Sequence, residues 1–266
     1  MDKRILGLLL VGWLLLSLPG YASSEKGVVR IAVASNFLAT FKTVSRDFTE
    51  QTGIKVHISN GATGMLYAQI KRGAPYDLFF SADSKRPLLL EEEGLTEPGS
   101  RFTYVFGKLV AWSPKPEKIS PDLAKLKADN PALRFMAIAN PKTAPYGEAA
   151  KAALKFYGLY AALKAQNKFA LGENVGKAYH YVVSGNAQIG LVAKSYVANP
   201  ERPVKGAFYD IPNHLYPEIA QQAVLLKGKN SPAVQAFLNY FKSAKVQDLI
   251  ESRGYGLAST TDPAKS

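Results

Sequence analysis

The chain alternates between short apolar runs and stretches in which apolar residues recur with the 3.6-residue period of a helix. The first unit is an apolar run over residues 28–34, then Ser35 and Asn36, then a helical pattern from Phe37. It predicts a strand, a tight turn and a helix capped by Ser35 or Asn36. Such a helix start aims unpaired N–H groups and the positive end of the helix dipole at one point, where an anion can bind. An N-cap that serves only its own helix is the alternative.

The same sequence of strand, turn and helix start recurs three more times along the chain. The starts are Thr63 before a helix over 65–72, Tyr146 before a helix over 148–157, and Val175 ahead of a helix over 176–183. Asn174 is a natural N-cap, which puts Val175 at the first helical position with its N–H unpaired. For Thr63 a plain turn is the alternative, and for Tyr146 packing against its own helix.

Strands and helices alternate in two batches, which predicts an α/β fold of two lobes. Each lobe is expected to be a doubly wound sheet flanked by helices, with a ligand cleft at the carboxyl ends of the strands. Further strands are predicted over 54–58, 78–81, 134–139, 168–171, 188–193, 207–211 and 222–226, and further helices over 84–93, 122–127, 232–241 and 246–252. A long strand-like run over 104–112 is broken by Gly107-Lys108. The expected division is lobe 1 over 28–107 and 217–258, lobe 2 over 108–216, and a disordered tail over 259–266.

Residues 1–22 have the features of a secretory signal peptide: a basic start, an apolar run over 5–18 and small residues at Gly20 and Ala22. The apolar run is shorter than the roughly 18 residues that a membrane-spanning helix needs. We predict cleavage near Ala22, with an uncleaved anchor as the alternative. No later stretch of the sequence is long and apolar enough to span a membrane.

The chain contains no cysteine, which excludes disulfides, thiol catalysis, thiolate metal sites and a lipid anchor on an N-terminal cysteine. A secreted protein without such an anchor is retained most easily in a periplasm. The formal charge is +12, and loss of residues 1–22 removes two positive charges and one negative charge to leave +11. The basic residues are scattered singly among acidic ones, with no nucleic-acid motif, so we interpret the charge as a solvated surface with some steering of anions.

The residues that catalysis would need are absent from the sequence. The three histidines, His57, His180 and His214, lie far apart and share no metal-ligand spacing. No nucleophile elbow, Walker loop or dinucleotide-binding glycine motif occurs. Asp77 and Asp83 flank a short strand without an assignable acid or base partner, and are expected to be caps or hinge residues. We therefore predict a binding protein and not an enzyme.

The side chains at the four helix starts are neutral and mostly hydrogen-bond donors. An amino-acid receptor would be expected to offer an arginine to the ligand carboxylate and an acid to its ammonium group. A hydrogenphosphate site needs an acceptor for the proton of the ligand. A site made only of donors suits a fully deprotonated tetrahedral oxyanion, and helix dipoles can balance its charge without a buried lysine or arginine.

Short motifs mark the same strand ends and turns. They are Val33-Ala34-Ser35-Asn36-Phe37, Gly61-Ala62-Thr63-Gly64, the string Gly-Ala-Pro-Tyr-Asp-Leu-Phe-Phe-Ser-Ala-Asp over 73–83, Asn140-Pro141 through Pro145-Tyr146-Gly147, Glu173-Asn174-Val175 and Gly190-Leu191-Val192. With these motifs, from about residue 28 to residue 256, the chain resembles the periplasmic molybdate-binding proteins of ATP-driven molybdate transporters. The string over 73–83 is the most specific of them.

The resemblance implies a two-lobed type II binding fold with a hinge, and a cleft that holds molybdate or tungstate by hydroxyls and backbone amides. It implies ligand contacts from Ser35 and Asn36, from Thr63, and from Tyr146 and the Val175 amide in the other lobe. Molybdenum would be bound only as molybdate through these residues, with no cofactor. Many members carry an oxyanion-binding tyrosine at the position of Ala193, and members without it use a tyrosine placed like Tyr146.

The sequence therefore predicts a monomeric periplasmic receptor for molybdate, and for tungstate, that delivers its ligand to the membrane permease of an ATP-binding-cassette importer. A receptor of the same fold for sulfate or another small anion is the second hypothesis. A secreted enzyme is the third.

Overall fold

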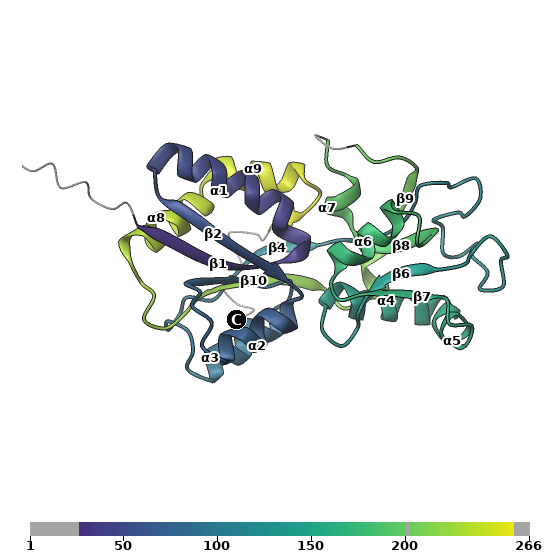
Figure 1. Ribbon diagram of the computed structural model, residues 1–266, viewed down its shortest axis with the longest axis horizontal. Helices are drawn as coiled ribbons and strands as arrows, with labels where there is room; N and C mark the ends of the chain where they lie inside the picture. Colours follow the sequence, from purple (N-terminus) through teal and green to yellow (C-terminus); the bar gives the residue numbers. More distant parts are fainter. Residues whose placement is uncertain (1–26, 201–202, 258–266) are drawn as a thin grey trace, which may run out of the picture.

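The computed structural model describes residues 27–200 and 203–257, which form two lobes side by side (Figure 1). Each lobe is built on a mixed β-sheet with helices packed against it. The prediction of an α/β fold with two helix-flanked sheets is therefore confirmed. The predicted signal peptide over 1–22 and the predicted tail over 259–266 lie outside the described residues.

The first lobe contains a six-stranded sheet in the order β11-β4-β10-β3-β1-β2. Strand β1 runs parallel to β2 and β3, whereas β10 runs antiparallel to β3 and β4. The strands are β1 (Val28–Ala34), β2 (Lys55–Gly61), β3 (Leu78–Phe80), β4 (Phe102–Gly107), β10 (Ile219–Leu225) and β11 (Gly256–Leu257). Because β1, β2 and β3 are parallel, their carboxyl ends meet at one edge of the sheet, where binding sites of open α/β sheets lie.

Helices cover both faces of this first sheet. They are η1 (Ser35–Phe37), α1 (Leu38–Thr52), α2 (Thr63–Lys71), α3 (Lys85–Glu92), α8 (Pro232–Phe241) and α9 (Ala244–Ser252). Figure 1 shows α1, α8 and α9 on one face and α2 with α3 on the other. On the first face the fully buried ring of Phe37 lies 5.0 Å from the ring of Tyr104 and 5.1 Å from that of Tyr255, edge to face. This packing anchors the turn that begins at Ser35.

The second lobe contains a five-stranded sheet in the order β7-β6-β8-β5-β9. Strand β6 runs parallel to β7 and β8, whereas β5 runs antiparallel to β8 and β9. The elements are β5 (Leu109–Ser113), β6 (Met136–Ala139), α4 (Pro145–Phe156), α5 (Leu159–Ala165), β7 (Phe169–Gly172), α6 (Val175–Val183), β8 (Ile189–Ala193), α7 (Lys194–Val197), β9 (Ala207–Asp210) and η2 (Asn213–Leu215).

The chain passes between the two sheets at residue 108 and again over residues 211–218. The predicted strand-like run over 104–112 forms two strands of different sheets, β4 and β5, which divide at the break expected at Gly107-Lys108. Lys108 is exposed at the crossing, between the partly buried strand β4 and the fully buried strand β5. The break at Gly107-Lys108 is the only local signal.

The predicted short helix over 122–127 is wrong, because the structure has only turns there. Ile119, Leu123 and Leu126 are spaced as on a helix, but they are buried anchors by which a loop packs onto the core of the second lobe. Two short helices, α5 and α7, were not predicted. Helix α5 begins directly after Gly158, whose positive φ of 69° turns the chain sharply out of α4.

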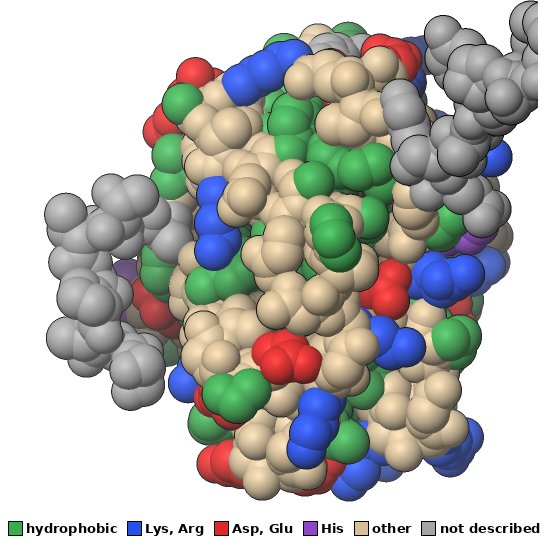
Figure 2. Space-filling model, turned by 90° about the vertical axis from the view of Figure 1, so that its left-hand side faces the viewer, with side chains coloured by type: hydrophobic (Ala, Val, Ile, Leu, Met, Phe, Trp, Pro, Cys, Tyr) green, Lys and Arg blue, Asp and Glu red, His purple; other side chains and the backbone are tan. Residues whose placement is uncertain are grey.

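The surface of the first lobe agrees with the interpretation of the charge. On the face seen in Figure 2, lysine and arginine side chains lie apart from one another and are interspersed with acidic and uncharged groups. Within the two described ranges, no helix has the length and apolar character that crossing a membrane requires.

Candidate functional site

The five predicted site residues all lie at helix starts. Ser35 and Asn36 open η1 after β1, and Thr63 is the first residue of α2 after β2. Tyr146 is the second residue of α4, and Val175 is the first residue of α6. Figure 1 shows the amino ends of α1 and α2 turned towards the second lobe. Each of the five residues is at most 5% exposed, so the structure holds all of them out of water.

Backbone contacts bring helix starts of the two lobes together. The Gly64 N–H in α2 donates to the carbonyl of Thr143, just before α4, at 3.0 Å. A Cβ on Gly176 in α6 would lie 3.6 Å from the Cβ of Ser35. The first contact joins α2 to the start of α4, and the second places the start of α6 beside η1.

Side chains join Asn36 and Tyr146 through a third residue, Gln221 of β10. The Nδ2 of Asn36 donates to Gln221 Oε1 at 2.9 Å, and Gln221 Nε2 donates to the Tyr146 hydroxyl at 3.3 Å. In the described part of the chain, no hydrogen bond joins Val175 directly to the other four predicted residues.

The start of the first helix differs from the prediction. Ala34 is the N-cap residue of η1, and neither Ser35 nor Asn36 caps a helix through its side chain. A 3₁₀ turn precedes α1 instead, and the Nδ2 atom of Asn36 donates to Gln221. The Asn36 Oδ1 atom is buried and has no hydrogen-bond partner among the described residues.

Three hydroxyls hold the two carbonyl groups of this turn. Tyr196 of α7 donates to the Ser35 carbonyl at 2.6 Å, from the opposite lobe. Tyr255 and Ser195 donate to the Asn36 carbonyl at 2.7 Å and 3.3 Å. In a trans peptide the C=O and N–H groups point in opposite directions. The hydroxyl of Tyr196 therefore fixes the direction in which the N–H of Asn36 points.

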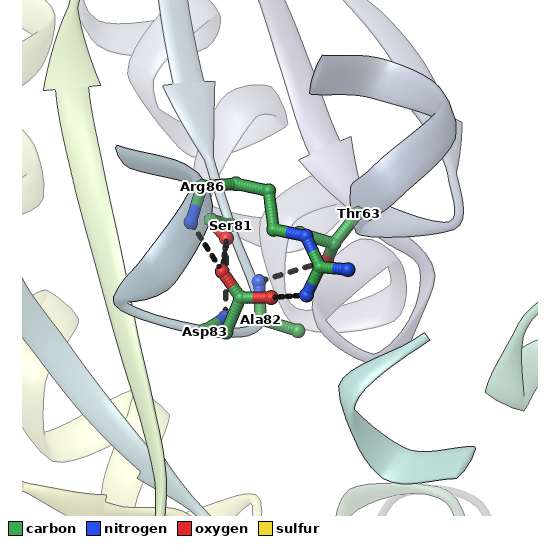
Figure 3. Close-up of polar contacts among 5 residues, drawn as sticks. All are labelled: Thr63, Ser81, Ala82, Asp83 and Arg86. Atoms are coloured by element: carbon green, nitrogen blue, oxygen red, sulfur yellow. Dashed lines mark hydrogen bonds and ion pairs between the residues drawn. The ribbon is translucent and has the colours of Figure 1, made fainter. Parts of the chain in front are cut away.

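The Thr63 hydroxyl is fixed as an acceptor from the backbone. The Ala82 N–H donates to Thr63 Oγ1 at 3.1 Å, in the turn that follows β3 (Figure 3). An N–H group cannot accept a hydrogen bond, so the hydroxyl hydrogen of Thr63 is free to be donated elsewhere. Thr63 is 1% exposed, and a buried hydroxyl hydrogen is expected to meet an acceptor.

At the start of α6 the prediction is confirmed. The Asn174 side chain accepts from the N–H of Lys177 at 2.9 Å and so caps the helix. Asn174 has an extended backbone, with φ −144° and ψ 173°. Val175 is the first helical residue, a position whose N–H has no intrahelical acceptor.

A cavity of about 410 Å³ opens between the lobes beside these helix starts. Ser35, Lys42 and Asn60 line it from the first lobe, and Lys177 and Tyr196 line it from the second. Of the five predicted residues only Ser35 contributes to its lining. The cavity therefore reaches the first helix start at Ser35 and the start of α6 at Asn174 and Gly176.

The hydroxyls near the site remain protonated at physiological pH. Burial raises the pKa of Tyr146 well above its ordinary value, and burial also raises the pKa of Tyr196 and Tyr255. A protonated phenol has a hydrogen to donate. None of the five predicted residues is charged, so the arrangement offers neutral donors and helix ends to a ligand.

The two aspartates noted in the sequence have structural partners. Asp77 accepts from the Arg30 N–H at 2.7 Å. Asp83 accepts from the backbone N–H of Arg86 at 2.9 Å and pairs with the guanidinium of the same residue (Figure 3). Asp83 thus accepts from the first turn of α3, although the N-cap residue of that helix is Ser84. In the described ranges no three His, Cys, Asp or Glu side chains lie close enough together to hold a metal ion.

Comparison with known protein families identifies the family to which the chain belongs. The family of bacterial extracellular solute-binding proteins matches residues 29–256, which is most of the sequence. The chain belongs to this family. A solute-binding protein holds and releases its ligand unchanged, so the family bears out the predictions that the chain is not an enzyme and that the bound species is a ligand and not a cofactor.

Among curated relatives, this solute-binding protein is 44% identical over 236 residues to the molybdate-binding protein ModA of Azotobacter vinelandii, covering 88% of this chain and 92% of that one. It is 41% identical over 241 residues to ModA of Rhodobacter capsulatus, covering 90% and 91%. Among solved structures, the periplasmic molybdate-binding protein of A. vinelandii superposes with a TM-score of 0.80 at 38% identity, covering 86% of this chain and 99% of that one.

The sequence-based prediction missed the residues that support the helix starts of this solute-binding protein: Gln221, Tyr196, Ser195 and Tyr255. The predicted strand began at residue 222, whereas β10 begins at Ile219. Two successive glutamines within an apolar strand were the available signal for Gln221. At Ala193, where many relatives were expected to carry a tyrosine, the structure has a fully buried residue that ends β8, and Tyr196 follows it in α7.

Proposed function

We propose that the chain is a periplasmic receptor for molybdate, and for tungstate as well, that delivers the oxyanion to the membrane permease of an ATP-binding-cassette importer. The observation that carries this proposal is that five neutral, buried residues lie at four helix starts, and that contacts join these starts across the two lobes. Ser35, Asn36 and Thr63 supply the ligand contacts of one lobe, and Tyr146 and the Val175 amide supply those of the other.

The chemistry of these groups suits a tetrahedral dianion. A fully deprotonated oxyanion presents only acceptors, and hydroxyls with backbone N–H groups present donors. Helix amino ends add a favourable electrostatic field, so no lysine or arginine has to be buried to balance the charge. The names of the relatives supply the particular oxyanion, since both curated relatives and the solved structure are molybdate-binding proteins.

The proposal includes the route and form of the mature receptor. A signal peptide cleaved near Ala22 exports the chain, which then works as a monomer in the periplasm. We propose lobe 1 over 28–107 and 217–258 and lobe 2 over 108–216, hinged at the two crossings. The membership of the strands supports these limits, because strands from 28–107 and 219–257 form one sheet and strands from 109–210 form the other.

Isothermal titration calorimetry of the mature chain from Ser23 tests the proposal. Molybdate, tungstate, sulfate and phosphate are titrated separately at equal ionic strength, after the protein has been unfolded, dialysed and refolded to remove carried-over ligand. We expect one site per chain for molybdate and tungstate and no measurable heat for the other two anions. Tight binding of sulfate in place of molybdate would keep the receptor and overturn the ligand. Binding of none of the four would overturn the proposed function.

A further inference from the structure

Gln221 lies between the two groups of ligand-binding candidates without being one of them. It belongs to β10 of the first lobe, at a point where the pairing of β10 with β4 shifts register, and its side chain is fully buried. Its Oε1 atom accepts from Asn36 Nδ2 at 2.9 Å and lies 3.0 Å from the hydroxyl of Tyr104. Its Nε2 atom is 3.3 Å from the hydroxyl of Tyr146, in the second lobe. The amide therefore has different partners at its two ends.

These partners decide which way the hydrogen of Tyr146 points. An amide NH₂ group can only donate, so the Tyr146 oxygen accepts from Gln221 and its own hydrogen is directed elsewhere. Gln221 is the one hydrogen-bond partner that the Tyr146 hydroxyl has among the described residues. Since Tyr146 is 1% exposed, its hydrogen needs a buried acceptor, and an oxyanion beside the helix starts is such an acceptor.

The tight packing around this pair leaves the hydroxyl little choice of position. Gly107 ends β4 directly against it: a Cβ at Gly107 would collide with the Tyr146 oxygen and would lie 2.6 Å from Gln221 Nε2 and 3.0 Å from Ile219 Cγ2. The φ angle of Gly107 is not positive, so this glycine is required for its small size and not for its conformation. The oxygen of Tyr146 is thus held between Gly107 and the Gln221 amide.

The Thr63 hydroxyl is oriented in the same way by a backbone group. Its oxygen accepts from the Ala82 N–H, so its hydrogen points elsewhere. Neither hydroxyl hydrogen then has an acceptor among the described residues, so both are available to a ligand. A hydrogenphosphate ion carries one O–H that requires an acceptor, and a hydroxyl whose hydrogen is free to rotate can supply one. A hydroxyl whose hydrogen is directed at the ligand cannot supply that acceptor.

We propose that Gln221 is a positioning residue for selectivity: by donating to the Tyr146 oxygen, it commits Tyr146 to donate to the ligand and so favours fully deprotonated oxyanions over hydrogenphosphate. This inference rests on the proposed function and concerns the same site. Gln221 acts through Tyr146 and does not itself touch the oxyanion.

A double-mutant cycle with Gln221→Glu and Tyr146→Phe tests the inference. A glutamate carboxylate has the shape of the glutamine amide but can only accept, so it draws the Tyr146 hydrogen to itself and away from the ligand. We expect Gln221→Glu to weaken molybdate binding about tenfold or more, as for loss of one hydrogen bond to a charged acceptor. In the Tyr146→Phe background the same substitution should cost markedly less, because the hydrogen that it diverts is already gone.

Gln222→Glu is the matched control, because it makes the same change one residue further along β10. The Gln222 side chain is also buried, but it contacts Arg101 and Thr103 within the first lobe. We expect wild-type affinity from this variant. If Gln221→Glu fails to fold, as judged by circular dichroism, Gln221→Met replaces it in the cycle, since it removes the donation to Tyr146 without adding charge. Gln221→Met should also narrow the preference for molybdate over phosphate several-fold.

The results separate the two proposals. A Gln221 substitution that costs the same factor with and without Tyr146, or that leaves both affinity and the preference over phosphate unchanged, overturns the positioning role while the receptor stands. Failure of the wild-type chain to bind molybdate overturns the proposed function itself.

Discussion

Replacing Val175 by proline removes one backbone N–H and leaves the fold around it intact. Val175 is the first residue of α6, where proline is tolerated because the N–H has no intrahelical acceptor. The residue before a proline must be extended, and Asn174 already is, with φ −144° and ψ 173°. The cap formed by the Asn174 side chain with the N–H of Lys177 does not involve the replaced group.

The loss of affinity follows from the kind of hydrogen bond removed. A hydrogen bond to a charged acceptor contributes about 1.5–3 kcal/mol. At about 1.4 kcal/mol per factor of ten, its removal weakens binding about 10- to 150-fold. This range is a lower bound, because the proline ring occupies the space in which the oxyanion would approach the amide.

Calorimetric titration of molybdate against the wild type and two variants measures the effect. Val175→Ala is the control: it keeps the N–H and trims the side chain, which is 3% exposed, so it should lower thermal stability and leave affinity close to the wild type. A folded Val175→Pro protein with wild-type affinity would refute the reasoning, since the amide would then not be a ligand. Equal losses in the two variants would attribute the effect to side-chain packing.

Three further predictions concern closure, ligand binding and acid stability. Tyr196→Phe removes the hydroxyl that reaches the Ser35 carbonyl across the lobes, so molybdate should dissociate about 2- to 10-fold faster in stopped-flow fluorescence, and an unchanged rate would contradict this role. Molybdate at about 1,000 times its Kd should stabilise the chain by about 4 kcal/mol, a rise of about 8–16 °C in Tm that sulfate should not reproduce. A hydrogen bond from Lys245 leads the contacts that lower the pKa of Asp47 to about 2. The stability that Asp47→Asn removes should therefore be constant above about pH 4 and vanish as pH falls towards 2 in acid-unfolding curves, whereas a difference that persists at pH 2 would argue against ionisation as its origin.

Local signals in the sequence were enough to predict where a helix follows a strand, although not which residue caps the first helix. Apolar runs ending in small polar residues placed β1 before Ser35, and the residue type at Asn174 identified its cap, which the structure confirms. These features depend on a few neighbouring residues. The ends of α8, Pro232–Phe241, were predicted for the same reason, since proline at the first position marks a helix start without reference to the rest of the fold.

Features that depend on contacts between distant parts of the chain could not be predicted from local sequence signals. The spacing of Leu123 and Leu126 mimicked a helix because a loop uses them as anchors on the core of the second lobe. The residues that support the site were also missed, because they are distant in the sequence from the groups that they contact. Tyr196 and Gln221 are 161 and 185 residues away from the Ser35 and Asn36 groups that they contact, and no local pattern marks such pairs.

Within the site, sequence reasoning proposed residues but not their hydrogen-bond directions. Thr63 and Tyr146 were recognised as possible donors, yet the groups that donate to their oxygens, the Ala82 N–H and the Gln221 amide, come from the turn after β3 and from β10. The direction in which a hydroxyl donates its hydrogen depends on which group donates to its oxygen, and only the folded structure shows that group. The assignment of the five residues to the ligand remains a prediction.

Anomalous diffraction from crystals of the tungstate complex tests the central claim most directly, because tungsten is located without reference to the protein. The account predicts one strong peak per chain, with oxyanion oxygens within hydrogen-bond distance of Ser35, Asn36, Thr63, Tyr146 and the Val175 amide. A peak instead in the neighbouring 410 Å³ cavity beside Lys42 and Lys177 would contradict it, because charged side chains would then bind the ligand that neutral helix starts are proposed to hold.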